Sequence, residues 1–187
     1  MQDAVPRGEG GMVAVLGSTV DIIEKILKDH ENYNTVEIAN DNSDGQIVLS
    51  GKNVDLDKLI NVLKNNNIKN IKLPVSAPFH CNLMNKATEV MKKEIETVNF
   101  QDSNISLISN VTANEILDKN ELKELLIKQV ENRVRWRESV ITMIEKNINQ
   151  FIEIGPGKIL SGLVKRINKS VKINTINSEI DIKDLNT

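Results

Sequence analysis

The residue best suited to chemistry is His80, which stands in the stretch SAPFHCNLM at residues 76–84. Periodicity places this stretch between the end of a strand and the start of a helix. Loops at the carboxyl ends of strands line the ligand crevice of doubly wound sheets, and a histidine there can accept a proton from a hydroxyl nucleophile near neutral pH. Spacing alone leaves a second interpretation open, namely a histidine that hydrogen-bonds the backbone at a helix start.

Other reactive residue types favour structural interpretations. Cys81 is the only cysteine, which excludes an internal disulfide and a zinc site built on several thiolates. Adjacent side chains point apart, so we expect Cys81 to be a small buried hydrophobe and not a partner for His80. Residues 155–158 (GPGK) lack the G-x-x-x-x-G-K-[ST] pattern of a phosphate loop and predict a tight strand-to-helix turn.

Polar and basic residues offer weaker binding hypotheses. Asn42, Ser43 and Gln46 could bind a ligand or serve a hairpin turn. Basic side chains form two clusters, which predict either solvated faces or sites for an acidic partner or a phosphate. The members of these clusters are Arg133, Arg135, Arg137, Lys165 and Arg166. The chain contains no G-x-S-x-G nucleophile elbow.

The composition is that of a globular protein. The 187 residues carry 24 Lys and Arg against 26 Asp and Glu, a net charge of −2, and 40% of them are hydrophobic. This balance gives no electrostatic footprint for nucleic acid, and an aromatic content of 3% leaves few platforms for stacking bases. There is no signal-peptide pattern and no apolar run of about 18 residues, the length of a membrane span. We therefore expect a cytoplasmic protein in a reducing compartment, with no nucleic-acid or membrane partner.

Residues 11–76 predict the element order β-α-β-β-α-β. Strands are expected at residues 11–16, 35–38, 46–50 and 68–73, and helices at residues 19–30 and 54–64. Ser18 is the expected cap of the first helix, which closes at His30. The segment NDNSDG at residues 40–45 predicts a turn. This order is the split βαβ, ferredoxin-like plan, which predicts a first domain over residues 11–76.

The rest of the chain has a different character. Helices are predicted at residues 83–98, 122–130, 136–146 and 159–168, and strands at residues 105–109, 151–154 and 171–176. Alternating helices and short apolar strands indicate a parallel α/β sheet. A parallel sheet of about three strands rarely covers both of its faces, so we expect this region to be part of a larger domain.

Taken together, these motifs resemble bacterial malonyl-CoA:acyl carrier protein transacylase. The matching stretches run in the family's order and cover nearly the whole chain. They are MQDAVPRGEGGMVAVLG, NDNSDGQIVLSG, LPVSAPFHCNLM, KQVENRVRW and FIEIGPGKILSGLVKRI. The resemblance implies an α/β-hydrolase-like large domain, incomplete here, that includes residues 1–10 and 77–187. It also implies an inserted ferredoxin-like small domain at residues 11–76.

The resemblance further implies a ping-pong reaction. A serine takes the malonyl group from CoA and passes it to the phosphopantetheine thiol of acyl carrier protein, with no cofactor or metal. His80 matches the family's general base for that serine. Gln129 matches the residue whose backbone carbonyl orients this histidine, so we expect side-chain changes at Gln129 to matter little. Asn42 matches a position in the loop that approaches the active site.

By the same resemblance, the serine, the malonyl-binding arginine and an oxyanion-hole glutamine all match family positions before Met1. We therefore expect the chain to correspond to the C-terminal part of the enzyme and to be inactive alone, with a separate N-terminal half as a possible partner. One alternative is a noncatalytic module that binds acyl carrier protein or CoA through Lys158, Lys165 and Arg166. The other is an unrelated ferredoxin-like regulatory or RNA-binding domain, although a pI near 5.8 argues against RNA.

Overall fold

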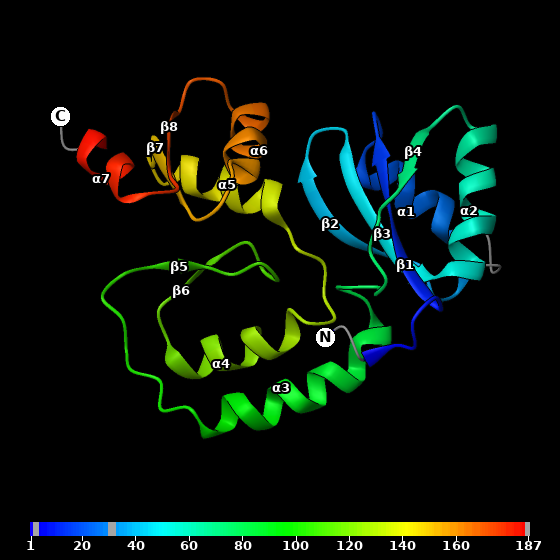
Figure 1. The fold of residues 1–187 in the computed structure, drawn as a ribbon, viewed down its shortest axis with the longest axis horizontal. Helices are drawn as coiled ribbons and strands as arrows, with labels where there is room; N and C mark the ends of the chain where they lie inside the picture. The colour runs from blue at the N-terminus through cyan, green and yellow to red at the C-terminus, as the bar shows by residue number, and fades with distance from the viewer. Residues whose placement is uncertain (2–3, 30–32, 186–187) are drawn as a thin grey trace.

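The computed structural model describes residues 1, 4–29 and 33–185, whose helices and strands form two groups (Figure 1). The first group contains β1 (Gly10–Leu16), α1 (Val20–Lys28), β2 (Glu37–Ser43), β3 (Gln46–Lys52), α2 (Asn53–Asn65) and β4 (Lys69–Lys72). The second contains α3 (Asn85–Thr97), β5 (Leu107–Ile108), β6 (Glu115–Ile116), α4 (Lys119–Lys128), α5 (Trp136–Glu145), β7 (Gln150–Ile154), α6 (Ile159–Ile167), β8 (Lys172–Ile176) and α7 (Glu179–Leu185). His30, the predicted end of the first helix, lies outside the described residues.

The first group is built on an antiparallel sheet with the strand order β2-β3-β1-β4. The predicted element order β-α-β-β-α-β is confirmed. Alternate residues of the strands share one buried core with the apolar faces of α1 and α2. Its most deeply buried members include Val15, Ile23, Leu49, Leu56 and Leu59.

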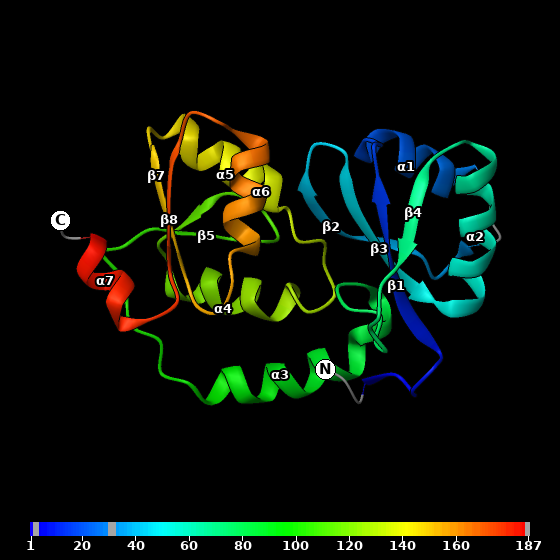
Figure 2. The same cartoon turned by 45° about the horizontal axis from the view of Figure 1, so that its top comes forward.

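The opposite face of this sheet receives the segment that carries His80. Met12, Ala39 and Val48 are buried on that face, against Leu73 and Phe79. After a short 3₁₀ turn (Asn82–Met84), the chain passes into α3, which leads away from the sheet in both views (Figure 1, Figure 2). The predicted place of His80, between a strand and a helix, is therefore confirmed.

The predicted cap of the first helix is wrong by one residue. The cap of α1 is Thr19, whose Oγ1 accepts a hydrogen bond from the Ile22 backbone N–H at 3.4 Å. Ser18 is buried instead. Both hydroxyl residues suit a helix start, and the position of the chain as it leaves β1 decides which one faces the free N–H groups.

The turn predicted at residues 40–45 is mostly strand. β2 continues as far as Ser43, with two register irregularities where it pairs with β3. A bulge inserts an extra residue and interrupts the ladder locally, while the strand continues on both sides of it. Only Asp44 and Gly45 remain in the turn, and Gly45 adopts φ +72°, which glycine tolerates without a steric cost.

The second group has two small sheets where one larger parallel sheet was predicted. β7 and β8 are parallel, and α5 and α6 cover one side of this pair through a buried valine cluster. β5 pairs instead with β6 in an antiparallel hairpin, which the Ser109 N–H to Asn114 carbonyl bond of 3.0 Å helps to close. This local pairing takes β5 out of the parallel sheet. Ile105, the first residue of the strand predicted at residues 105–109, lies before β5 and is 80% exposed.

Candidate active site

The loop that carries His80 is anchored on both sides of that residue. Pro78 is fully buried against Gly10 of β1, where a Cβ would lie 2.5 Å from the proline ring. Phe79 packs into two apolar clusters, one on the sheet and one between the start of α3 and the end of α4. His80 itself has φ +59°, a conformation uncommon for a residue with a Cβ. Strain of this kind persists where the surroundings fix it, and it is frequent at functional sites.

The half-buried ring of His80 is held by the end of a helix. Its Nδ1 lies 2.8 Å from the backbone oxygen of Gln129, the residue that caps the C-terminus of α4. The last carbonyls of a helix lack partners within the helix, so this oxygen is free to accept. A carbonyl only accepts, so Nδ1 carries the proton and Nε2 keeps its lone pair.

The structure brings together two of the three predicted site residues. His80 and Gln129 meet although 49 residues separate them. Asn42 lies half-buried in β2, so its predicted place in a loop is wrong, because the bulged strand extends through this position. Hydrogen bonds among the described residues do not join Asn42 to His80. Instead, the Val134 backbone exchanges hydrogen bonds of 2.8 and 2.9 Å with β2 and so ties it to the segment after α4.

Cys81 is fully buried beside the site. Its thiol donates to the Pro78 carbonyl at 3.1 Å, and the Ser50 hydroxyl lies 3.7 Å from the sulfur. Burial raises the pKa of the Cys81 thiol above its ordinary value. A thiol that stays protonated is a poor nucleophile. The prediction of a small buried hydrophobe is confirmed.

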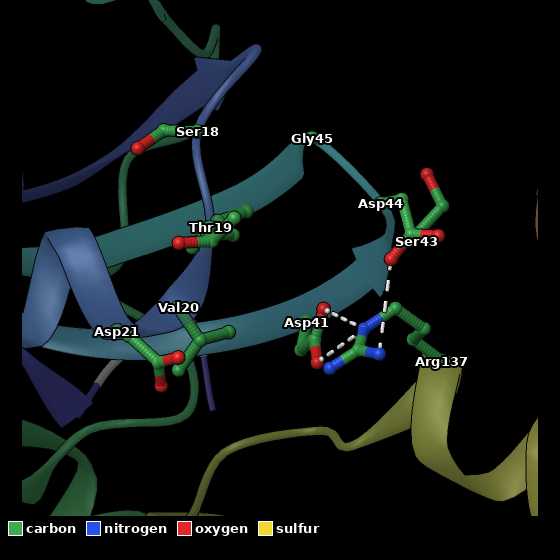
Figure 3. Close-up of a pocket in the computed structure, with 10 residues that line it drawn as sticks. Ser18, Thr19, Val20, Asp21, Asp41, Ser43, Asp44, Gly45 and Arg137 are labelled. Atoms are coloured by element: carbon green, nitrogen blue, oxygen red, sulfur yellow. Dashed lines mark hydrogen bonds and ion pairs between the residues drawn. The ribbon is translucent and has the colours of Figure 1, made fainter.

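A cavity of about 300 Å³ lies between the start of α1, the β2–β3 turn and α5, and its lining includes no residue of the His80 loop (Figure 3). Arg137 reaches from α5 toward Asp41 of β2, with Nε 3.0 and 3.2 Å from the two carboxylate oxygens. Burial raises the pKa of Asp41, and the neighbouring Arg137 opposes that shift. This ion pair joins the two groups of elements. Sequence reasoning missed it because 96 residues separate the partners.

The first basic cluster is neutralised within the protein. Arg133, Arg135 and Arg137 contact the carboxylates of Glu24, Glu138 and Asp41, respectively. The carboxylates offset the positive charge of these arginines, which favours the structural interpretation of the cluster over a phosphate or acidic-partner site. Lys165 and Arg166 are exposed on α6, and they hydrogen-bond the Lys169 carbonyl and the Gln46 side chain.

The remaining motif forms the predicted turn. Residues 155–158 connect β7 to α6, and Gly155 and Gly157 have φ +133° and +94°, which a residue with a Cβ rarely adopts. Among the described residues, no three His, Cys, Asp or Glu side chains are grouped so that they could hold a metal ion. Within the same part of the chain, no helix is long and apolar enough to cross a membrane.

A histidine with a free Nε2, held on the carbonyl of a helix end, is suited to activating a nucleophile for acyl transfer. A family model described as "Acyl transferase domain" matches residues 1–181, and the chain belongs to this family. As the motifs predicted, it is similar to malonyl CoA-acyl carrier protein transacylases. The one from Bacillus subtilis (strain 168) is 41% identical over 174 residues, which are 92% of this chain and 55% of that protein. The one from Staphylococcus aureus (strain COL) is 37% identical over 188 residues, covering 100% of this chain and 61% of that protein.

Solved structures agree. The malonyl CoA-acyl carrier protein transacylase from Clostridium perfringens ATCC 13124 has a TM-score of 0.94 and 41% identity, covering 99% of this chain and 58% of that one. Another match, with a TM-score of 0.90 and 30% identity over 97% of this chain and 59% of that one, is a malonyl-transacylase in complex with a type II PKS acyl-carrier protein. The chain thus spans 55 to 61% of the length of these relatives.

Proposed function

We propose that the chain is part of an acyl transferase that moves a malonyl group from CoA to the phosphopantetheine thiol of acyl carrier protein, with His80 as its general base. The observation that carries the proposal is the 2.8 Å contact between His80 Nδ1 and the Gln129 carbonyl. This carbonyl takes the orienting role that a carboxylate has in a Ser-His-Asp triad. The similarity to malonyl transacylases supports the substrate class.

The proposed reaction has two half-reactions and needs no metal or cofactor. In the first, His80 Nε2 takes the proton of a serine hydroxyl while the serine oxygen attacks the malonyl thioester; the C–S bond then breaks and the CoA sulfur leaves with that proton. In the second, Nε2 takes the proton of the phosphopantetheine thiol, whose sulfur attacks the acyl-serine; the ester C–O bond then breaks and the serine oxygen leaves with that proton. A positioned base contributes about 10² to 10⁴-fold to the rate of such a step.

The proposed architecture has two domains. Residues 11–76 form a ferredoxin-like small domain, and residues 1–10 and 77–187 belong to an α/β-hydrolase-like large domain. The β2-β3-β1-β4 order supports the first assignment, and the parallel β7–β8 pair beneath α5 and α6 supports the second. In this arrangement Asn42 contributes to substrate binding from β2.

Two partners follow from the proposal. Because the 187 residues contain no G-x-S-x-G motif, the serine comes to His80 from a polypeptide segment that carries this motif. Acyl carrier protein docks through the exposed basic residues Lys158, Lys165 and Arg166, at and after the start of α6. The complex between a related malonyl-transacylase and an acyl-carrier protein supports this choice of partner.

Malonyl transfer to acyl carrier protein, followed by mass spectrometry, tests the function. We expect no turnover by the chain alone, because loss of the nucleophile from a serine triad costs about 10⁶ in kcat and loss of an oxyanion donor about 10² to 10³. Adding a polypeptide with the serine segment should restore transfer. In that mixture His80→Ala should abolish it, whereas His30→Ala, which removes the only other histidine, should not. Transfer that survives His80→Ala would refute the assignment.

A further inference from the structure

The Gln129 side chain has a partner of its own. Its Oε1 accepts a hydrogen bond of 3.1 Å from Asn110 Nδ2, and both residues are half-buried. The backbone oxygen of Gln129 accepts the hydrogen bond from His80. Gln129 therefore contacts His80 through its backbone and Asn110 through its side chain. This contact gives a physical reason for the Gln129 side chain to matter, contrary to what the resemblance implied.

Asn110 lies in a segment that is fixed independently of α4. Its carbonyl accepts a hydrogen bond of 2.9 Å from the Arg135 N–H, at the start of α5. Ser109, directly before it, is buried, and the Ser109 hydroxyl accepts from the Val111 N–H at 3.1 Å. The Arg135 guanidinium also donates to the Thr112 carbonyl at 3.2 Å. Contacts outside α4 therefore hold Asn110 in place, and its hydrogen bond to the Gln129 side chain restrains the end of that helix.

The last turn of α4 departs from regular α-helical hydrogen bonding. Beyond Gln129 the helical bonding changes, since the Val130 N–H reaches back three residues to Ile127 at 3.3 Å. Last turns of helices fray, and their carbonyl directions are then poorly defined. His80 depends on one such carbonyl while its own backbone is held at φ +59°. A small rotation of the Gln129 peptide would break the contact with Nδ1.

We infer that Asn110 is a positioning residue: through the Gln129 side chain it fixes the carbonyl that selects the Nδ1-protonated form of His80. The importance of the Nδ1-protonated tautomer for catalysis rests on the proposed function. The effect of the Asn110–Gln129 hydrogen bond on that tautomer does not. A neutral hydrogen bond contributes about a fivefold factor to an equilibrium. We therefore expect loss of the Asn110 contact to lower the ratio of Nδ1–H to Nε2–H tautomer at His80 about fivefold.

Nitrogen-15 NMR of the imidazole rings measures this ratio in the whole chain, at a pH where the rings are neutral. The chain has two histidines, and His30→Gln assigns the signals. Asn110→Ala should shift His80 toward the Nε2–H form. Gln129→Met should do the same, because it removes the side-chain oxygen Oε1 that accepts from Asn110. Gln129→Glu keeps an acceptor oxygen for Asn110 Nδ2 and should therefore shift the ratio less than Gln129→Met. Asn114→Ala, an exposed asparagine of the same hairpin, is the matched control.

The double variant Asn110→Ala/Gln129→Met should show no further shift, because both changes remove the same bond. An unchanged tautomer ratio in a folded Asn110→Ala protein would overturn the inference, as would additive shifts in the double variant. If Asn110→Ala does not fold, Gln129→Met compared with Gln129→Glu decides the matter. A tautomer shift without any transfer in the reconstituted assay would support the effect of the Asn110–Gln129 hydrogen bond and reject the proposed function.

Discussion

Replacing Arg137 by methionine tests how the two groups of elements are joined at the cavity in Figure 3. The Asp41 side chain is 2% exposed, whereas Asp44, a second carboxylate near Arg137, is 84% exposed. Removing one partner of a buried ion pair costs about 3–5 kcal/mol. Arg137 is itself 29% exposed, so water reaches the pair and we expect the lower value, about 3 kcal/mol at neutral pH. The exposed contact with Asp44 adds less than about 1 kcal/mol.

This loss of stability has a predictable pH dependence. Burial raises the pKa of Asp41, and Arg137 is the main group that opposes the shift. A carboxyl with a raised pKa binds its proton more tightly in the folded than in the unfolded protein. Its contribution to stability is therefore complete below its ordinary pKa and is lost as pH rises through the folded value. Without Arg137 that pKa rises further, so Arg137→Met should cost most near pH 8 and clearly less near pH 5.

Urea unfolding followed by circular dichroism at pH 5 and pH 8 measures the effect. Arg7→Met, at an exposed turn, is the matched control and should change stability by less than about 0.5 kcal/mol. The double variant Asp41→Asn/Arg137→Met removes the buried charge together with its partner, so it should recover most of the loss. An equal loss at both pH values, or a double variant no more stable than Arg137→Met, would contradict a stabilising role for this ion pair.

Three further predictions rest on buried or close contacts. The raised pKa of the Cys81 thiol and its full burial should make its reaction with a disulfide reagent far slower in the native protein than in urea, and equal rates would contradict this. Gly10→Ala, whose Cβ would lie 2.5 Å from a buried proline ring, should lose about 1–3 kcal/mol in thermal unfolding, whereas Gly162→Ala, with open space around it, should not. The Thr35 hydroxyl is the main cause of the lowered pKa of Asp55, so the stability it provides is present at neutral pH and lost on acidification through the folded pKa. Thr35→Val also removes the hydrogen bond that the Thr35 hydroxyl accepts from the Lys52 N–H at 3.1 Å, a loss common to both pH values. The variant should therefore lose about 1 kcal/mol more at pH 7 than at pH 2, and an equal loss at both would count against it.

Local patterns in the sequence were sufficient for most elements of the fold. Apolar residues at helical spacing placed α1 and α2, a short apolar run placed β1, and alternation of apolar and polar residues placed β4, because each pattern depends only on residues close in the sequence. The same short range explains the errors. The hydroxyls of Ser18 and Thr19 are equivalent as helix caps on local grounds, and a run of polar turn residues does not reveal that bulges will keep β2 extended.

The motifs were sufficient to identify the family, and the resemblance paired His80 with the Gln129 carbonyl. The contacts that hold this pair in place became visible in the folded structure alone. Asn110 meets Gln129 across 19 residues, and Arg137 meets Asp41 across 96. Such contacts depend on how helices and strands pack against one another. Local propensities do not determine which residues distant in the sequence come into contact. The exposure of Ile105 likewise depends on tertiary structure, because the pairing of β5 with β6 fixes the position of its segment.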